Sequence, residues 1–261
     1  MRKAGIMVLA AAVAIGASGQ ALPQIIAHRG GSKEQDENTL SGFKSSYEKG
    51  ARGFETDVRL TKDRRIVVLH DDTLDRTTTG AGRVEEQTAV DLAPVRTKKT
   101  GQPLTYLEEL LDFIKSKPDA FVQVEIKCGK YPESDLAEMC SIMTKQVAEK
   151  DVSKQVVFIC FEPRAIKKIK ELNPKQATCL VSADVGPKVI ETAKAVGAEY
   201  LSVQINKLYR AFVQDAHKEG LKVTAWTVQN AADAQLAIAL GTDCVTTDIP
   251  AAQLEQKTAR P

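Results

Sequence analysis

Phe54-Glu55-Thr56-Asp57-Val58 is a short apolar run that carries two carboxylates. Because successive side chains of a β-strand point to opposite faces, Glu55 and Asp57 point to the same face. Three other apolar runs also end in an ionisable residue: 25–28 (IIAH), 66–70 (IVVLH) and 121–127 (FVQVEIK). Strands that end in this way expose those residues at one edge of a sheet, so the sequence predicts a polar site at the mouth of a parallel barrel.

The rest of the chain alternates short apolar runs with amphipathic stretches. Eight runs are predicted strands: 24–28, 53–58, 121–126, 156–160, 177–181, 200–204, 222–227 and 244–247. Each is followed by a predicted helix: 39–49, 105–115, 134–149, 163–172, 187–196, 208–218, 231–240 and 250–257. This order is typical of a (β/α)8 TIM barrel, an α/β fold. We also expect Asn38 to cap the first helix and Asp248 to cap the last.

A ninth apolar run, at residues 66–70, has no helix before it. The link to the preceding strand is short and polar, so we expect residues 55–70 to form a β-hairpin centred on Asp63. Pairing outward from Asp63 sets His70 opposite Thr56. The hairpin therefore brings a second histidine to the two carboxylates without occupying a barrel position.

Length and composition favour one large α/β domain over disorder. The chain has 261 residues, of which 43% are hydrophobic and 27% are charged. We place the barrel domain at residues 22–261, with residues 73–104 as an insertion loop after the second strand. The formal net charge is +2 and no basic stripe stands out, so nucleic acid is not an expected partner.

The N-terminal residues 1–21 are typical of a secretory signal peptide. Arg2 and Lys3 precede an apolar segment at residues 4–17, and Ala21 suits cleavage. The apolar segment is too short to span a membrane comfortably. We therefore expect an exported protein, periplasmic or secreted, whose mature chain has a formal charge of +2 − 2 = 0 and is not stably inserted in a membrane.

The chain has an odd number of cysteines and no pair with metal-ligand spacing. They are Cys128, Cys140, Cys160, Cys179 and Cys244. Three of them lie in strand-like runs, where a free cysteine packs as a small hydrophobic side chain. Structural packing is the favoured interpretation, and one disulfide in an exported protein remains open.

Glu55, Asp57 and Glu125 can converge on one divalent cation, because their strands are neighbours in the predicted barrel. Ligands that are all oxygen favour Mg²⁺ or Ca²⁺ over zinc. The alternative is three solvated carboxylates at a rim. Their place in apolar strands favours a metal site, since ionised carboxylates are rarely buried without a partner.

Two histidines at strand ends, His28 and His70, could serve as a general acid–base pair, because imidazole titrates near neutral pH. For a single histidine a structural hydrogen bond would be the better interpretation, but two of them flank the carboxylates. Arg29 and Lys127 could bind a phosphate or simply balance the acidic charge. Trp226 ends the seventh barrel strand and is either a core residue or a wall of the substrate site.

These residues form part of an ordered set of motifs that resembles the glycerophosphodiester phosphodiesterase family over essentially the whole mature chain. The motifs are 28–30 (HRG), 37–39 (ENT), 55–58 (ETDV), 61–63 (TKD), 70–71 (HD), 125–127 (EIK), 226–228 (WTV) and 247–250 (TDIP). The resemblance implies a TIM barrel, one divalent metal ion and hydrolysis of glycerophosphodiesters to glycerol 3-phosphate and an alcohol.

The resemblance also assigns roles to individual positions. It implies that His28 and His70 are the acid–base pair and that Glu55, Asp57 and Glu125 are the metal ligands. It also implies that Arg29 and Lys127 contact the phosphate and that Trp226 lies at the mouth of the barrel. Glu37 matches a motif and either orients Arg29 or caps the loop. Three positions depart from the family pattern, with Asp36 for Pro, Gln229 for Asn and Cys160 for Ser. The last two bear on substrate preference.

Two other functions are considered. A lysophospholipase D-like phosphodiesterase would act on larger lipids and would need an apolar mouth. A non-catalytic barrel that binds phosphate esters would need no acid–base pair. A small-molecule substrate is favoured, while the released alcohol, the choice of Mg²⁺ or Ca²⁺ and the oligomeric state are left open.

Overall fold

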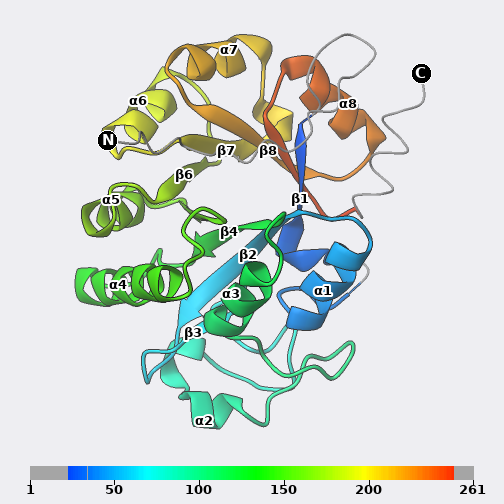
Figure 1. Ribbon diagram of the computed structural model, residues 1–261, viewed down its shortest axis with the longest axis vertical. Coiled ribbons are helices and arrows are strands. Elements are labelled where there is room, and N and C mark those ends of the chain that lie inside the picture. The colour runs from blue at the N-terminus through cyan, green and yellow to red at the C-terminus, as the bar shows by residue number, and fades with distance from the viewer. Residues whose placement is uncertain (1–22, 34, 250–261) are drawn as a thin grey trace, which may run out of the picture.

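The computed structural model describes residues 23–33 and 35–249 and contains a closed barrel of eight parallel strands (Figure 1). These strands are β1 Gln24–Ala27, β2 Gly53–Leu60, β4 Phe121–Ile126, β5 Val156–Cys160, β6 Ala177–Ser182, β7 Tyr200–Gln204, β8 Lys222–Val228 and β9 Cys244–Thr247. Strand β1 pairs with both β2 and β9, and this pairing closes the barrel. The predicted TIM-barrel fold is confirmed.

Helices alternate with the strands and lie around the outside of the barrel (Figure 1). They are α1 Leu40–Glu48, α3 Leu107–Lys115, α4 Glu133–Glu149, α5 Pro163–Leu172, α6 Pro187–Ala195, α7 Arg210–Lys218 and α8 Ala231–Leu240. Observed and predicted bounds of these elements differ by at most two residues. The predicted helix at 250–257 and the predicted signal peptide at 1–21 lie outside the described residues.

The predicted hairpin is present in the predicted register. Strand β3, Ile66–Val68, runs antiparallel to β2, and Val58 pairs with Val68. Continued two residues beyond the paired segment, this register sets His70 opposite Thr56. Beyond the hairpin, the insertion carries a 3-10 turn at Val84–Glu86 and a short helix, α2 Ala89–Leu92. A separate small apolar cluster packs this region: Val67, Leu69, Leu74, Val84, Leu92, Val95 and Leu104.

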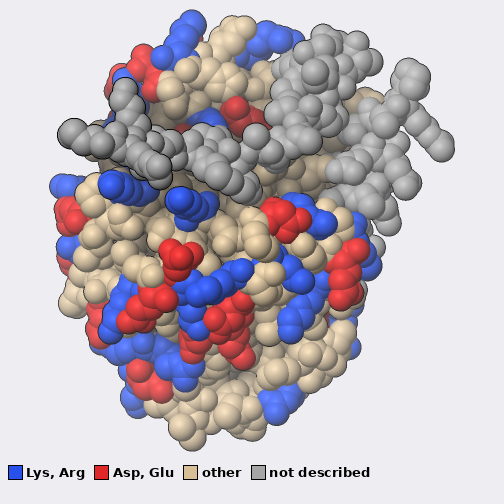
Figure 2. Space-filling view, in the orientation of Figure 1, with Lys and Arg blue, Asp and Glu red and all other residues tan. Residues whose placement is uncertain are grey.

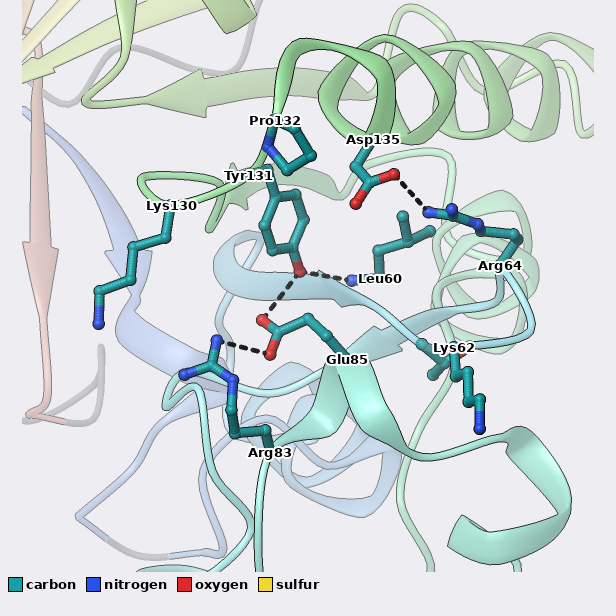
Figure 3. Close-up of a pocket in the computed structure, with 10 residues that line it drawn as sticks. Leu60, Lys62, Arg64, Arg83, Glu85, Lys130, Tyr131, Pro132 and Asp135 are labelled. Atoms are coloured by element: carbon teal, nitrogen blue, oxygen red, sulfur yellow. Dashed lines mark hydrogen bonds and ion pairs between the residues drawn. The ribbon is translucent and has the colours of Figure 1, made fainter.

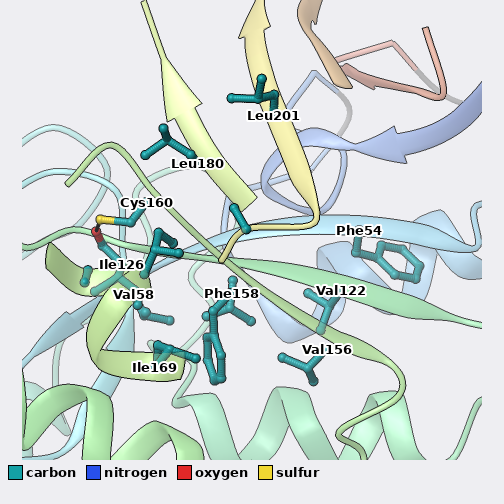
Figure 4. Close-up of a cluster of buried hydrophobic side chains, with 14 of the residues drawn as sticks. Phe54, Val58, Val122, Ile126, Val156, Phe158, Cys160, Ile169, Leu180 and Leu201 are labelled. Carbon is teal, nitrogen blue, oxygen red and sulfur yellow. Dashed lines mark hydrogen bonds between the residues drawn. The ribbon is translucent and has the colours of Figure 1, made fainter. Parts of the chain in front are cut away.

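The main core fills the space between the barrel and its helices (Figure 4). Phe54 and Phe158 are fully buried on β2 and β5, and Ile169 of α5 belongs to the same cluster. Burying side chains of this size stabilises each strand by about 2 kcal/mol per residue. All five cysteines lie among the described residues, and all are buried and free. The packed core therefore holds the barrel strands in place beneath the side chains at their ends.

The N-cap of α1 differs from the prediction. Thr39, not Asn38, caps the helix, and its hydroxyl accepts a hydrogen bond from Gly42 N at 3.1 Å. Asn38 has a positive φ of 59°, and its side chain turns inward to donate to Asp57 Oδ2 at 2.9 Å. Asparagine adopts this backbone conformation more readily than most residues, and the contact with Asp57 uses it.

Acidic and basic side chains are interspersed on the face seen in Figure 2. Of the helices within residues 23–249, none combines the length and the apolar character that crossing a membrane requires.

Candidate active site

Three carboxylates meet where β2 and β4 lie side by side. Oxygen atoms of Glu55, Asp57 and Glu125 all lie within 4.8 Å of one another. Asp57 pairs directly with Glu125 in the β2–β4 register, and Glu55 lies two residues earlier on the same face. Glu55 and Asp57 are only 3% and 1% exposed, so this cluster is not a solvated rim.

The three carboxylates repel one another when they are ionised, and this changes their pKa values. Burial, and then the charge of Asp57, raises the pKa of Glu55, and the same two causes raise the pKa of Glu125. Burial would also raise the pKa of Asp57, but Lys127, His70 and Arg29 together hold it below its usual value. Full ionisation of all three carboxylates therefore needs more positive charge than these side chains supply.

The donor set fits a hard divalent cation. Glu55 Oε1 is buried and has no hydrogen-bond partner among residues 23–33 and 35–249. Asp57 Oδ1 accepts no hydrogen bond in the same part of the chain and lies 3.3 Å from Lys127 Nζ. Oxygen atoms that are buried, close together and unsatisfied are suited to Mg²⁺ or Ca²⁺.

His28 follows β1 at the same end of the barrel. Its Nδ1 lies 2.6 Å from Asp248 Oδ1, and its Nε2 lies 3.8 Å from Glu55 Oε2. Burial alone would lower the pKa of His28, but the hydrogen bond with Asp248 and the charge of Glu55 raise it. One ring nitrogen is thus held by a carboxylate while the other faces the acidic cluster.

A tight turn after His28 aims the next residue at the cluster. Arg29 has a φ of 52°, and its backbone N–H donates to Glu55 Oε2 at 3.0 Å. Gly30 also has a positive φ, and a Cβ there would lie 2.9 Å from the ring of Phe43. The sequence His-Arg-Gly therefore makes a turn that larger third residues would block.

His70 follows β3 of the hairpin, and like His28 it contacts a carboxylate through Nδ1. Its Nδ1 lies 2.8 Å from Asp71 Oδ1. Arg76 donates to Asp71 Oδ2 at 2.5 Å and also binds both carboxylate oxygens of Glu37. Burial lowers the pKa of His70. Both predicted catalytic histidines are therefore oriented through Nδ1 by a carboxylate.

The two predicted phosphate-binding cations lie in the cluster and pair with its carboxylates. Arg29 donates to Glu37 Oε1 at 3.0 Å, and its Nε lies 3.6 Å from Asp57 Oδ2. Lys127 donates to Glu125 Oε1 at 2.8 Å. Glu37 therefore holds Arg29, which is one of the two roles that the sequence left open for it.

Trp226 lies two residues before the end of β8, and its ring meets Phe161 edge-on with centroids 5.8 Å apart. Trp226 Nε1 is buried without a hydrogen-bond partner in the described part of the chain. Phe161 is 41% exposed and follows β5 directly. The tryptophan is therefore partly core and partly a wall beside an exposed aromatic ring.

Several residues of this network were not identified as functional from the sequence. Asp248 was expected to cap the helix at 250–257, which lies outside the described residues; its side chain binds His28, Ser32 and Gln229. The signal was available, since Ala27 pairs with Thr247 and the next residues along the two strands are His28 and Asp248. Arg76 gave no such signal, because it lies in the insertion.

Of two neighbouring pockets, one adjoins the cluster. This one, of about 270 Å³, is lined by Glu125, Lys127 and Phe161 together with residues of the insertion. The other, of about 310 Å³, lies farther from the carboxylates, beside the hairpin (Figure 3). The two share four lining residues: Arg83, Glu85, Lys130 and Tyr131. In Figure 3 the Tyr131 hydroxyl donates to Glu85 and accepts from Leu60 N. Each lining includes charged side chains of both signs beside apolar surface.

Comparison with known proteins places this chain among relatives of one kind. Residues 28–252 match the model of the glycerophosphoryl diester phosphodiesterase family. A glycerophosphodiester phosphodiesterase of Caldanaerobacter subterraneus subsp. tengcongensis is 32% identical over 232 residues, which cover 87% of this chain and 94% of that protein.

Solved structures agree with this match. An Oleispira antarctica phosphodiesterase, solved in complex with the product sn-glycerol-3-phosphate, has a TM-score of 0.82 at 26% identity and covers 90% of this chain and 96% of that one. A glycerophosphodiester phosphodiesterase of Parabacteroides distasonis has the same fold, with a TM-score of 0.82 at 24% identity, and covers 92% of this chain and 98% of that one.

Proposed function

The chain belongs to the glycerophosphoryl diester phosphodiesterase family, and from this we propose that it hydrolyses glycerophosphodiesters to glycerol 3-phosphate and an alcohol. We propose further that the reaction depends on one divalent cation and uses His28 and His70 as its acid–base pair. One observation carries this proposal: two histidines, each held at Nδ1 by a carboxylate, flank a buried cluster of three carboxylates.

Glu55, Asp57 and Glu125 would hold the cation, Mg²⁺ or Ca²⁺. When bound, such an ion lowers the pKa of a coordinated hydroxyl and neutralises charge on a phosphate. The unsatisfied Glu55 Oε1 and the raised pKa values of Glu55 and Glu125 support this assignment. The family match also supports it, since the matched region includes all three residues.

The chain's own residues then move the protons. One histidine takes the proton of the glycerol hydroxyl that attacks phosphorus, and the other gives a proton to the leaving alkoxide. Asp248 and Asp71 keep the two imidazoles in orientation by accepting at Nδ1. Arg29 and Lys127 would turn from the carboxylates toward the phosphate and stabilise negative charge on the phosphorane.

In this scheme the first step forms a cyclic glycerol phosphate, and water then opens the ring while the histidines exchange roles. Rapid-quench ³¹P NMR under single-turnover conditions tests it. The cyclic species should appear and decay before glycerol 3-phosphate accumulates. Product that carries one solvent ¹⁸O, formed with no cyclic species at any time, would instead mean that water attacks the diester directly.

The pocket linings favour a small polar head group over a lipid. Lys127, Lys130, Glu125 and Glu162 surround the nearer pocket, and an acyl chain would have to displace water from these charges. Trp226 would form one wall of the substrate site. Purified protein should therefore release glycerol 3-phosphate from glycerophosphocholine faster than it cleaves lysophosphatidylcholine. The reverse preference would favour the lysophospholipase D-like alternative.

His28→Ala and His70→Ala test the acid–base pair. Each should lower turnover on the order of a hundredfold or more, because general acid–base catalysis contributes on that scale. Near-normal rates in either variant would remove that histidine from the mechanism. Tight binding of a glycerophosphodiester with no turnover in the metal-loaded wild type would favour the non-catalytic binding barrel.

We also propose that the protein is exported to the periplasm or beyond, on the pattern of residues 1–21. N-terminal sequencing of protein recovered from cell fractions tests this. A chain that begins at Leu22 in an extracytoplasmic fraction is expected. An intact N-terminus confined to the cytoplasm would contradict export.

A further inference from the structure

Two thiols touch directly behind the active-site lysine. Cys128 Sγ lies 3.6 Å from Cys160 Sγ, although the two residues are 32 positions apart in the sequence. Among the described residues, which include all five cysteines, this is the pair whose sulfur atoms are in hydrogen-bond contact. The proton-transfer scheme above gives neither thiol a role.

The two thiols lie in different structural elements, one in a strand and one in a loop. Cys160 is the last residue of β5 and pairs with Leu180 of β6, so its position is fixed by the barrel ladder. Cys128 lies beyond the end of β4, in the loop that leads to α4. Lys127 is the residue just before Cys128. The thiol contact therefore joins a residue of a loop to a residue held in the barrel sheet.

The sulfurs already organise the backbone around Lys127. Cys160 Sγ donates to Ile126 O at 3.1 Å (Figure 4). The backbone N–H of Glu162 donates to Cys160 Sγ at 3.3 Å. The guanidinium of Arg164 donates to Cys128 O at 3.2 Å. The pair thus holds the first residues of the β4–α4 loop against the end of β5.

We propose that Cys128 and Cys160 form a disulfide that fastens the loop carrying Lys127 to the end of β5. A disulfide needs an S–S distance of about 2.05 Å, so the sulfurs must approach by about 1.5 Å. Because the sheet holds Cys160, this movement has to come from the loop at Cys128. The other cysteines keep the packing role expected from the sequence.

The reaction requires an oxidant, which we identify by class as a disulfide, either a small molecule or the active site of an oxidoreductase. The Cys128 thiolate attacks one oxidant sulfur, and the first oxidant thiol leaves. Cys160 then loses its proton and attacks Cys128 Sγ, and the second oxidant thiol leaves. Two protein thiols are oxidised to one disulfide, and one oxidant disulfide is reduced to two thiols.

Access and reactivity agree with this order of events. Both thiols are buried but line the pocket of about 270 Å³ beside Lys127, which gives a small disulfide a route to them. The contact with Cys160 lowers the pKa of Cys128, whereas that same contact and burial raise the pKa of Cys160. Cys128 is therefore the better first nucleophile.

The test exposes the reduced full-length protein to oxidised glutathione, blocks remaining thiols and maps peptides without reduction. A peptide that links Cys128 to Cys160 is expected. The oxidised protein should unfold about 5 to 10 °C above the reduced protein, because the cross-link closes a long loop in the unfolded chain. Dithiothreitol should reverse both changes.

Cys128→Ser and Cys160→Ser should each abolish the linked peptide and the oxidant-induced rise in melting temperature. Cys140→Ser is the matched control, since Cys140 is also buried in the same core cluster and should leave both effects intact. Absence of the linked peptide in folded wild type would overturn the proposal. So would a linked protein that melts no higher than the reduced one.

A third readout rests on the proposed function: oxidised enzyme should lose phosphodiesterase activity more slowly at elevated temperature than reduced enzyme. Equal inactivation rates in the two forms would overturn the link to Lys127. The linked peptide and the melting temperature do not depend on activity, so a failure of the proposed function would leave those two results interpretable.

Discussion

Asp248 Oδ1 lies 2.6 Å from His28 Nδ1, although 220 residues separate the two in the sequence. The contact exists because β1 and β9 pair as the closing strands of the barrel. Burial would raise the pKa of Asp248, but its bonds with His28, Gln229 and Ser32 hold that pKa well below its usual value. Barrel closure thus fixes the orientation of His28, one of the two histidines that we propose as the acid–base pair.

Asp248→Asn should lower turnover on the order of a hundredfold or more, because an amide does not hold the imidazole in the same tautomer. Steady-state kinetics at pH 7 to 8 measure this. Ser32→Ala is the matched control, since the Ser32 hydroxyl donates to the same oxygen of Asp248, whereas the Ser32 N–H that donates to His28 O at 3.3 Å belongs to the backbone and stays in the variant. A normal rate for Asp248→Asn would show that this carboxylate has no part in catalysis.

Arg76→Ala should weaken the support of His70 and also change acid stability. Hydrogen bonds from Arg76 hold the pKa of Asp71 at about 2, below the unfolded value of about 3.9. A lowered pKa contributes stability above about pH 4, and this contribution is lost as pH falls toward 2. After discounting for solvent screening, Arg76→Ala should cost on the order of 1 kcal/mol at pH 7.

Urea unfolding of wild type and Arg76→Ala between pH 7 and pH 3 measures that difference. The two free energies of unfolding should converge as the pH falls below 4. The turnover of Arg76→Ala should also drop while the Michaelis constant changes less. If the difference in unfolding free energy stays constant with pH, the stabilisation by Arg76 does not depend on the ionisation of Asp71.

Glu55→Gln should stabilise the cation-free protein at alkaline pH while removing cation binding. The folded state holds the Glu55 proton more tightly than the unfolded chain does, because burial and the charge of Asp57 raise its pKa. Cation-free wild type should therefore lose stability as pH rises from the unfolded value of about 4.3 toward the raised folded value.

Thermal unfolding in EDTA from pH 6 to pH 9, with and without added Ca²⁺ or Mg²⁺, tests this. Cation affinity of wild type should increase with pH, by up to about tenfold per pH unit for one displaced proton. Glu55→Gln should show a smaller alkaline loss of stability than wild type, with the remainder due to the raised pKa values of His28 and Glu125, and no stabilisation by cation. An affinity independent of pH would mean that Glu55 binds no proton near neutrality.

Phe158→Ala should cost about 3 to 5 kcal/mol in the free energy of unfolding, because Phe158 is fully buried between β5 and the helices. Val90→Ala is the control, since Val90 is 80% exposed in the insertion and should change stability by less than about 0.5 kcal/mol. Equal effects of the two substitutions in urea unfolding would contradict the assigned core.

The fold was accessible from the sequence because its strands are short, apolar and regularly followed by amphipathic helices. The polar link centred on Asp63 even fixed the register that sets His70 opposite Thr56. The partners of the histidines were harder to predict. Asp248 depends on which strands close the barrel, and Arg76 depends on how an insertion without periodic pattern folds back. The inward turn of Asn38 depends on a positive φ that the sequence does not state.

The central claim is tested most directly by release of glycerol 3-phosphate from a panel of glycerophosphodiesters, measured with purified mature protein before and after removal of metal with EDTA. We predict release that EDTA abolishes and that Mg²⁺ or Ca²⁺ restores, with Glu55→Gln inactive under both conditions. Release at full rate from protein verified to be metal-free, or no release from any diester with metal present, would contradict the account.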